Sequence, residues 1–334
     1  MLKVALLDDY AGAALGSADW GLLDGIAEIT VFRDHLSEER AAALLAPFDI
    51  LCTIRERMAL PRSLLERLPN LKLVTIIGTS LPNLDMEAAT EHGVLIIHPD
   101  PDKPANPGIA NATPELTWGL MIATVRHFAH EQQRMRDGLW QDTVGIILAG
   151  RTLGLLGLGR IGKRMADYGR AFGMEVIAWS QNLTAEAAAE AGVRRVDKDE
   201  LFARADIVSI HVRLSDRTRG LVTARELGLM RPDAYLVNTS RGLIVDEAAL
   251  IAALGGGRIA GAGLDVFDQE PLPADHPFRR LDNVTLTPHL GYTTRETLAA
   301  FYGDMPEAIA AFARGTPIRV INPAALAHAA GPTV

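Results

Sequence analysis

Three side chains with complementary chemistry lie late in the chain, each just after an apolar run. Arg241 follows YLVN, Glu270 follows GAGLDV, and His289 follows VTLT. An arginine fork can clasp a planar carboxylate bidentately, and a protonated histidine can donate its proton to a carbonyl oxygen as hydride reaches the carbon. A carboxylate on the second ring nitrogen would fix the tautomer and favour the imidazolium. Together these residues fit the reduction of a 2-oxo acid and are the candidate catalytic residues.

Each of the three also has a common structural explanation. An arginine after a strand is often half of an ion pair, a Glu-Pro pair in a loop is often solvated, and His289 is one of nine histidines. Their joint position after three strands of one predicted sheet favours the functional interpretation. His276 is a rival partner near Glu270. His127 and His130 lack a nearby third ligand, so we expect no metal site.

A glycine-rich turn in the middle of the chain could hold the hydride carrier. The stretch LGLLGLGRIG places glycines at 157, 159 and 162, after an apolar run and before a helical pattern. Gly157 permits the tight turn, Gly159 lets the backbone approach a pyrophosphate, and Gly162 allows close helix–strand packing. Such glycines also occur where the backbone merely needs positive φ, but the flanking strand and helix favour a dinucleotide site.

The choice between NAD and NADP stays open. An NAD site usually has an acidic residue about 20 positions beyond the first glycine, which bonds the ribose 2′-hydroxyl. Here Ser180, Gln181 and Asn182 follow the strand, and both the acid and an arginine for a 2′-phosphate are missing. Ser180 and Asn182 could bond either group, or could simply start a loop. We therefore expect weak discrimination, or readier acceptance of NADP(H) than an acidic site allows.

Alternating strand-like and helical patterns predict the elements that position these residues. Ser37 and Asp85 should cap helices 37–45 and 85–91, and Thr113 with Pro114 should open a long helix to about Arg136. Capping boxes are expected at Thr223–Glu226 and at Thr293–Glu296, the latter opening a helix to Arg314, and Asp246 should cap a helix through Leu254. Strands are predicted at 4–7, 28–32, 50–54, 71–76, 94–97, 153–156, 175–179, 207–210, 235–238, 261–266 and 284–287.

This pattern predicts an α/β protein with two Rossmann-like or flavodoxin-like parallel-sheet domains and an interdomain cleft. A proline-rich stretch at 98–108 separates the two blocks of strands. The final helix is expected to return to the first block. We therefore expect a substrate-binding domain of residues 1–103 plus 295–334, and a dinucleotide-binding Rossmann domain of residues 104–294.

The composition and charge of the chain argue against nucleic acid and membrane as binding partners. Of 334 residues, 48% are hydrophobic and 22% charged, and the net charge of −8 argues against a nucleic-acid surface. No apolar run approaches the roughly 18 residues of a membrane span, and the N-terminus does not resemble a signal peptide. Cys52 is the only cysteine, so an intrachain disulfide is excluded. A cytoplasmic location is expected.

The glycine-rich turn and segments 238–242, 263–272 and 287–291 together resemble the signatures of the D-isomer-specific 2-hydroxyacid dehydrogenases, and the likeness covers nearly the whole chain. The resemblance implies that Arg241 binds and polarises the substrate, that His289 is the acid/base and that Glu270 supports it. It implies that Ser80 and Leu81 lie in a loop for the substrate carboxylate, and that such proteins are homodimers built through the nucleotide domain and its long helix from Thr113. The residues assigned to the coenzyme are Gly157, Gly159, Arg160, Ile161, Gly162, Ser180, His211, Thr239 and Asp265, with Arg160 and Ile161 at the pyrophosphate and Asp265 on the nicotinamide side.

The chain also departs from that family's pattern. Ser180 replaces the usual aspartate, Pro82 replaces an aspartate in the carboxylate loop, Arg213 stands where proline is common, and Leu116 follows Glu115 where histidine is common. Because the loops around Arg55, Arg57 and Ser80 set substrate choice, the identity of the 2-oxo acid is left open.

The leading hypothesis is an oxidoreductase that transfers hydride between NAD(P)H and a 2-oxo acid to give a D-2-hydroxy acid. The alternative is a nucleotide-sensing, corepressor-like binding protein of the same fold. A formate dehydrogenase is disfavoured because formate oxidation needs no proton transfer of the kind that Glu270 supports. A catalytically idle nucleotide-binding subunit is disfavoured by the intact Arg241, Glu270 and His289 set.

Overall fold

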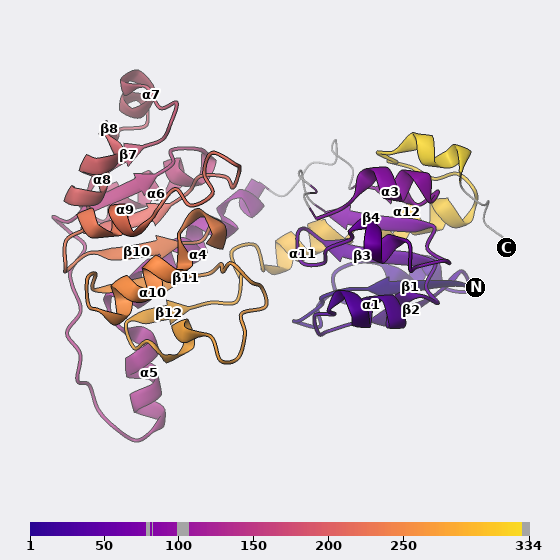
Figure 1. The fold of residues 1–334 in the computed structure, drawn as a ribbon, viewed down its shortest axis with the longest axis horizontal. Coiled ribbons are helices and arrows are strands. Elements are labelled where there is room, and N and C mark those ends of the chain that lie inside the picture. The colour runs from indigo at the N-terminus through magenta and orange to yellow at the C-terminus, as the bar shows by residue number, and fades with distance from the viewer. Residues whose placement is uncertain (78–80, 82, 99–106, 329–334) are drawn as a thin grey trace. The chain divides into compact units, whose positions relative to one another are not determined.

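The computed structural model describes residues 1–77, 81, 83–98 and 107–328, and the chain forms two compact units (Figure 1). Unit 1 comprises Met1–Pro107 and Thr294–Val334, and unit 2 comprises Gly108–Thr293. Unit 1 is therefore discontinuous in sequence, and the C-terminal segment joins the N-terminal one. Among the described helices, none combines the length and apolar character that a bilayer crossing requires.

Unit 1 contains a five-stranded parallel sheet in the order β2-β1-β3-β4-β5. Its central strands are continuous apolar runs, as expected for a sheet covered on both faces. Helices α1, α2 and α3 pack their alanines and leucines on one face. The strands are β1 (Leu2–Leu6), β2 (Ala27–Val31), β3 (Ile50–Ile54), β4 (Leu73–Ile77) and β5 (Leu95–Ile97), and the helices are α1 (Glu38–Leu45), α2 (Arg62–Leu65), α3 (Met86–Glu91), α11 (Arg295–Tyr302) and α12 (Met305–Ala313).

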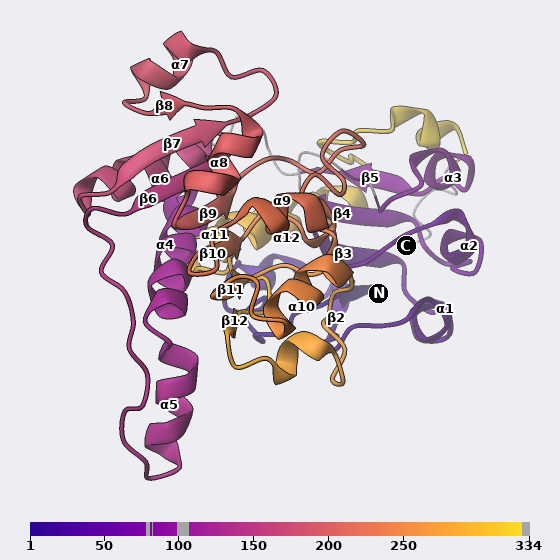
Figure 2. The same cartoon turned by 60° about the vertical axis from the view of Figure 1, so that its left-hand side comes forward.

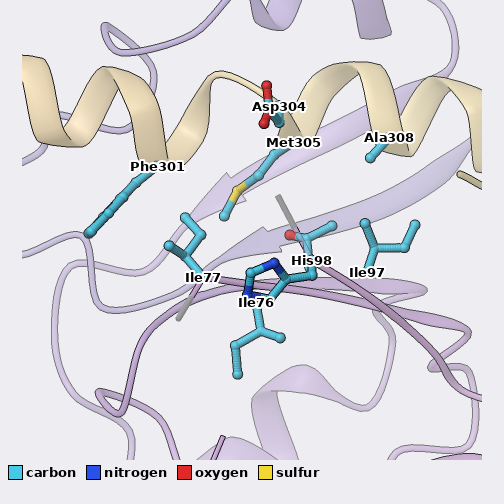
Figure 3. A pocket seen from close by; sticks show the side chains of 9 residues that line it. Ile76, Ile77, Ile97, His98, Phe301, Asp304, Met305 and Ala308 are labelled. Atoms are coloured by element: carbon cyan, nitrogen blue, oxygen red, sulfur yellow. The ribbon is translucent and has the colours of Figure 1, made fainter. Parts of the chain in front are cut away.

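The C-terminal helices α11 and α12 lie against β4 and β5 in unit 1. A cavity of only about 10 Å³ remains there, lined among others by Ile77, Phe301 and Met305 (Figure 3). That volume is about the minimum that a single water needs. This face of the sheet is therefore closely packed.

The prediction of one final helix to Arg314, opened by Thr293, was wrong. Thr294 is the N-cap of α11, and its hydroxyl accepts a hydrogen bond from the Thr297 N–H at 3.2 Å. The helix ends at Tyr302, and α12 begins at Met305. Pro306 explains the break, because proline lacks an N–H and its ring clashes with the carbonyl four residues earlier in a continuous helix.

Unit 2 contains a seven-stranded parallel sheet in the order β12-β11-β10-β9-β6-β7-β8 (Figures 1 and 2). Helices α8, α9 and α10 cover one face, and α4 and α6 cover the other. The strand order reverses at β6, which makes the carboxyl end of β6 the topological switch point where ligands of such sheets bind. The strands are β6 (Thr152–Leu156), β7 (Glu175–Trp179), β8 (Arg194–Arg195), β9 (Ile207–Ile210), β10 (Tyr235–Asn238), β11 (Gly261–Leu264) and β12 (Val284–Leu286), and the helices are α4 (Ala112–Val125), α5 (Phe128–Arg136), α6 (Arg160–Ala171), α7 (Ala185–Glu190), α8 (Lys198–Arg204), α9 (Ala224–Leu229) and α10 (Glu247–Gly255).

The two predicted parallel-sheet α/β folds are confirmed, and so are several caps. The Thr223–Glu226 capping box is present, and Asp246 accepts from the Ala249 N–H at 3.0 Å. Asp85 likewise caps α3. Ser37 occupies the N-cap position of α1 without a side-chain hydrogen bond among the described residues.

The predicted helix from Thr113 to Arg136 is interrupted. Its N-cap is Asn111, and it breaks at His127, whose φ is 54°. The returning chain supplies the reason, because the Ile146 N–H donates to the Val125 carbonyl at 3.2 Å. That carbonyl would accept from the next turn in a continuous helix. Long-range packing therefore overrides a helical pattern that is locally unbroken.

Candidate active site

The glycine-rich turn between β6 and α6 has the geometry of a dinucleotide cradle. Gly157 has a φ of +109°, and a Cβ on it would lie 2.7 Å from the backbone carbon of His211. A Cβ on Gly162 would lie 2.2 Å from the carbonyl oxygen of Gly157. A Cβ on Gly159 would meet nothing within 4 Å, and within the described part of the chain no side chain caps this end of α6. Open space before an uncapped helix N-terminus fits a pyrophosphate.

The residues predicted to meet the pyrophosphate open α6. Arg160 is its exposed first residue, and Ile161 is half-buried and packs against the core of unit 2. A contact between Ile161 and a pyrophosphate would therefore come from its backbone. The side chain serves packing.

Ser180 and His211 follow the strands on either side of β6. Ser180 comes directly after β7 and lines a pocket at its carboxyl end. The Nε2 atom of His211 lies 2.8 Å from the hydroxyl oxygen of Ser209. Burial lowers the pKa of His211 to about 3, so this imidazole is neutral near physiological pH. A neutral His211 can pack against the turn without adding charge.

The imidazole of His289 and the carboxylate of Glu270 are brought together. Nδ1 of His289 lies 2.5 Å from Oε2 of Glu270. The other carboxylate oxygen accepts a hydrogen bond from the Phe267 N–H at 2.9 Å, which fixes its orientation. Because Nδ1 is committed to Glu270, Nε2 is the ring atom that can exchange a proton with a substrate. His276, the rival, instead lies 3.0 Å from Oε1 of Glu247.

A buried carboxylate holds the backbone around His289. Asp265 is 0% exposed, and it accepts from the Thr287 hydroxyl at 2.6 Å and from the N–H groups of Leu290 and Gly291 at 2.7 and 2.9 Å. Its own carbonyl accepts from the His289 N–H at 2.8 Å. Burial raises the pKa of Asp265. The sequence patterns did not predict this clamp, and the assignment of Asp265 to the nicotinamide stays a prediction.

The backbone of His289 carries strain that the clamp maintains. Its φ is 53°, in the left-handed region that residues other than glycine rarely adopt. Such conformations persist when surrounding contacts determine them, and they are common at functional sites. The strained backbone belongs to the same residue that pairs with Glu270.

Arg241 lies in a loop that packs against the loop bearing Glu270. The side-chain amide of Asn238 donates to the Arg241 carbonyl at 2.9 Å, and the Arg241 guanidinium donates to the Ser240 carbonyl at 2.6 Å. A Cβ on Gly242 would lie 2.1 Å from the backbone carbon of Phe267. Only glycine therefore permits this approach of the two loops. Because β10, β11 and β12 are neighbours, all three catalytic candidates follow adjacent strands at one edge.

The remaining predicted contacts are distributed over both units. The hydroxyl of Thr239 lies 2.7 Å from that of Thr117 on α4, and both are buried. Leu81 packs against the core of unit 1, while Ser80 lies outside the described residues. Their roles toward substrate and coenzyme remain predictions.

A polar cluster in unit 1 was missed by the sequence patterns. Asp8 follows β1 and is buried, with a φ of 53°. Its carboxylate accepts from the Tyr10 hydroxyl at 2.9 Å, and its carbonyl accepts from the Arg57 guanidinium at 2.6 Å. These contacts join segments after β1 and β3, which no local motif reveals.

Comparison with known proteins agrees with this geometry. Residues 118–291 match the model of the "D-isomer specific 2-hydroxyacid dehydrogenase, NAD binding domain". The chain belongs to this family. A glyoxylate reductase of Aeropyrum pernix is 39% identical over 270 residues, which cover 78% of each chain. A glyoxylate reductase of Thermococcus litoralis is 34% identical, with 90% of this chain and 92% of the relative covered.

Other members of the family are similar along most of the chain. A D-3-phosphoglycerate dehydrogenase of Methanocaldococcus jannaschii is 36% identical over 94% of this chain, which spans 58% of that longer relative. The crystal structure of a phosphoglycerate oxidoreductase from Vibrio cholerae superposes with a TM-score of 0.86 at 36% identity, covering 94% of this chain and 99% of the other.

The family places this dehydrogenase among the NAD(P)-dependent oxidoreductases that interconvert 2-oxo acids and D-2-hydroxy acids. The predictions of an enzyme, of its reaction class and of a nicotinamide dinucleotide are thereby confirmed. The relatives named above are enzymes, so they give no support to the corepressor-like alternative. The choice between NAD and NADP remains open.

Proposed function

We propose that this dehydrogenase reduces a short 2-oxo acid, with His289 as proton donor, Arg241 as carboxylate clasp and Glu270 as support for the histidine. The observation that carries the proposal is the 2.5 Å contact between His289 and Glu270 on a clamped, strained loop. Glyoxylate and hydroxypyruvate are the first substrates to test. Glyoxylate reductases cover most of this chain, and a hydroxypyruvate reductase of Thermotoga maritima is 35% identical.

The proposed roles follow from the chemistry of each group. A nicotinamide coenzyme, when bound, would supply the hydride for the carbonyl carbon. Nε2 of His289 gives its proton to the carbonyl oxygen, so that a hydroxyl group forms. The carboxylate of Glu270 keeps the ring oriented and stabilises its protonated form. The guanidinium of Arg241 holds the substrate carboxylate with two parallel hydrogen bonds and so fixes which carbonyl face meets the hydride.

The test is a kinetic screen at 340 nm with glyoxylate, hydroxypyruvate, pyruvate and 3-phosphohydroxypyruvate, each with NADH and NADPH. His289→Ala should lower kcat by about 10²- to 10⁴-fold, the usual range for a general acid, while coenzyme affinity stays within about twofold. His276→Ala is the matched control, since that ring pairs with Glu247. An unchanged kcat in His289→Ala dismisses the proposed acid.

We also propose that the enzyme is a homodimer formed through unit 2. Helix α5 extends away from the rest of its unit (Figures 1 and 2), and every one of its described residues is at least partly exposed. Trp140 is 71% exposed and Val144 is 91% exposed in the segment that follows. A second copy would cover this apolar surface, which a soluble monomer rarely presents. Light scattering should give twice the chain mass, and Trp140→Ser with Val144→Ser should lower it.

The cytoplasmic location expected from the sequence is retained as a proposal. Fractionation of cells that express the tagged chain would test it.

A further inference from the structure

A pocket beside the glycine-rich turn has the lining expected for a phosphorylated ribose. It measures about 180 Å³ and combines the last residue of β7 and the residues after it with residues that follow β9. These strands flank β6, so the pocket lies over the switch point at which the turn begins. The N–H of Gly157 donates to the Trp179 carbonyl at 2.8 Å, which joins the turn to the pocket wall. The lining residues are Trp179, Ser180, Gln181, Asn182, Val212, Arg217, Thr218 and Leu221.

The charge of this lining is positive. Arg217 is the charged residue among the pocket's lining residues, and hydroxyl and amide groups of Ser180 and Asn182 stand with it. The carboxylate that would accept from a ribose 2′-hydroxyl and repel a 2′-phosphate is replaced by Ser180. Asp216, adjacent in sequence, is exposed and lies outside the lining. The pocket therefore suits an anion.

The Arg217 side chain is exposed, and the structure gives it no ion pair or hydrogen bond with any described residue. Arg225, by comparison, is paired with Asp199 and with Glu226. A planar guanidinium forms two parallel hydrogen bonds to a phosphate. The charge of Arg217 is thus available to a ligand.

The loop that carries Arg217 is held in place. The Thr218 hydroxyl donates to the Arg213 carbonyl at 2.6 Å and accepts from the Ser215 N–H at 2.8 Å. The Ser240 hydroxyl donates to the Val212 carbonyl at 2.5 Å and ties the start of the segment to the next loop. A fixed loop loses less conformational entropy when a ligand binds.

We propose that Arg217, together with Ser180 and Asn182, binds the 2′-phosphate of NADP(H), and that the enzyme therefore prefers NADP(H) to NAD(H). The inference rests on the coenzyme site and on none of the catalytic roles proposed above. NADP sites usually have an arginine near the position of Ser180. In this protein the arginine comes instead from the segment after β9. Hydrogen bonds to a charged phosphate predict a preference of about 10- to 100-fold in affinity.

Calorimetry with adenosine 2′,5′-bisphosphate and adenosine 5′-monophosphate tests the pocket without the nicotinamide or any substrate. The two probes differ only in the 2′-phosphate. The bisphosphate should bind at least about tenfold more tightly to the intact enzyme. Arg217→Ala should bring the ratio of the two Kd values close to one while the Kd of the monophosphate stays within about twofold. Arg219→Ala, two residues along and outside the pocket lining, should preserve the ratio.

A second variant tests the same pocket from the other wall. Ser180→Asp should weaken NADPH binding and strengthen NADH binding, as measured by quenching of tryptophan fluorescence, since a carboxylate repels the phosphate and accepts from a hydroxyl. Equal affinity of the intact enzyme for both adenosine probes overturns the proposal, and so does a preference that survives Arg217→Ala. Either result leaves the His289 test unaffected, so the two proposals fail separately.

Discussion

The buried carboxylate of Asp265 offers the sharpest test of how the proton donor is positioned. Its Oδ1 accepts from Thr287 and Leu290, and its Oδ2 accepts from Gly291. Asp265→Asn preserves the volume but replaces one oxygen with an NH₂ group. In either orientation the new nitrogen faces a backbone N–H, because each carboxylate oxygen accepts from one. At least one buried donor therefore loses its acceptor.

The size of the effect follows from that lost acceptor. A buried donor left unsatisfied costs roughly 1 to 3 kcal/mol. Because burial raises the pKa of Asp265, the neutral amide avoids part of the cost of burying a charge, so we expect a stability loss of about 1 kcal/mol. Thr287, Leu290 and Gly291 surround His289 in sequence. A penalty of about 1 to 3 kcal/mol on the placement of His289 in the transition state would lower kcat by about 5- to 150-fold.

The assay compares kcat, substrate KM and coenzyme Kd of the variant with those of the intact enzyme. A positioning role predicts that kcat falls while the substrate KM and the coenzyme Kd each stay within about threefold of the values for the intact enzyme. Thr287→Val removes one of the three bonds and should cost less, and the double variant should cost less than the product of the two single effects. Asp275→Asn changes an exposed acid between the same strands and is the matched control.

Two results would refute the reasoning about Asp265. A kcat within twofold of the intact enzyme would mean that the clamp does not position His289. A coenzyme Kd raised about tenfold at constant kcat would place Asp265 at the nicotinamide instead, as the family resemblance implies.

Three further changes test neighbouring groups. Glu270→Gln should lower kcat about 100-fold, whereas Glu247→Gln, whose carboxylate pairs with His276, should lower it less than threefold; equal losses would contradict the pairing. Arg241→Lys should raise substrate KM about tenfold or more because the bidentate clasp is lost, and an unchanged KM would remove Arg241 from the substrate site. Burial, followed by repulsion from Glu247 and Asp246, raises the pKa of Asp268 to about 6. The contribution of Asp268 to stability is therefore present below about pH 4 and is lost as pH rises through about 6. The Tm of Asp268→Asn should exceed that of the intact enzyme by an amount that grows between pH 4 and 7, and a Tm difference that does not change with pH would refute this.

The sheet fold was predictable because strands buried on both faces appear as uninterrupted apolar runs. The run ILCTI predicted β3 at its observed bounds, and the run LKLVTI at 71–76 predicted a strand that overlaps β4. Six of the seven unit 2 strands started within one residue of their predicted positions. The exception was β8, which consists of the exposed pair Arg194–Arg195. Two exposed charged residues carry no hydrophobic pattern.

Helix interruptions were less predictable because their causes differ. The break before α12 has a local cause, because Pro306 cannot continue the preceding helix. The prediction of one helix followed the pattern of apolar residues instead. The break at His127 has none, since the donor that takes the Val125 carbonyl is Ile146 on the returning chain. The pattern of apolar residues along one helix cannot predict a hydrogen-bond donor that comes from another part of the chain.

The same distinction separates the part of the site that the sequence predicted from the part that it did not. Arg241, Glu270 and His289 follow β10, β11 and β12, which are consecutive in the chain and adjacent in the sheet. Their chain order alone therefore placed them along one edge. Ser180 and Arg217 follow β7 and β9, which lie on opposite sides of β6 because the sheet reverses there. The residues next to Ser180 in sequence include no arginine. Arg217 lines the same pocket only because the reversal of strand order places β7 and β9 on either side of β6. The coenzyme preference that we propose therefore rests on both segments that flank the switch point.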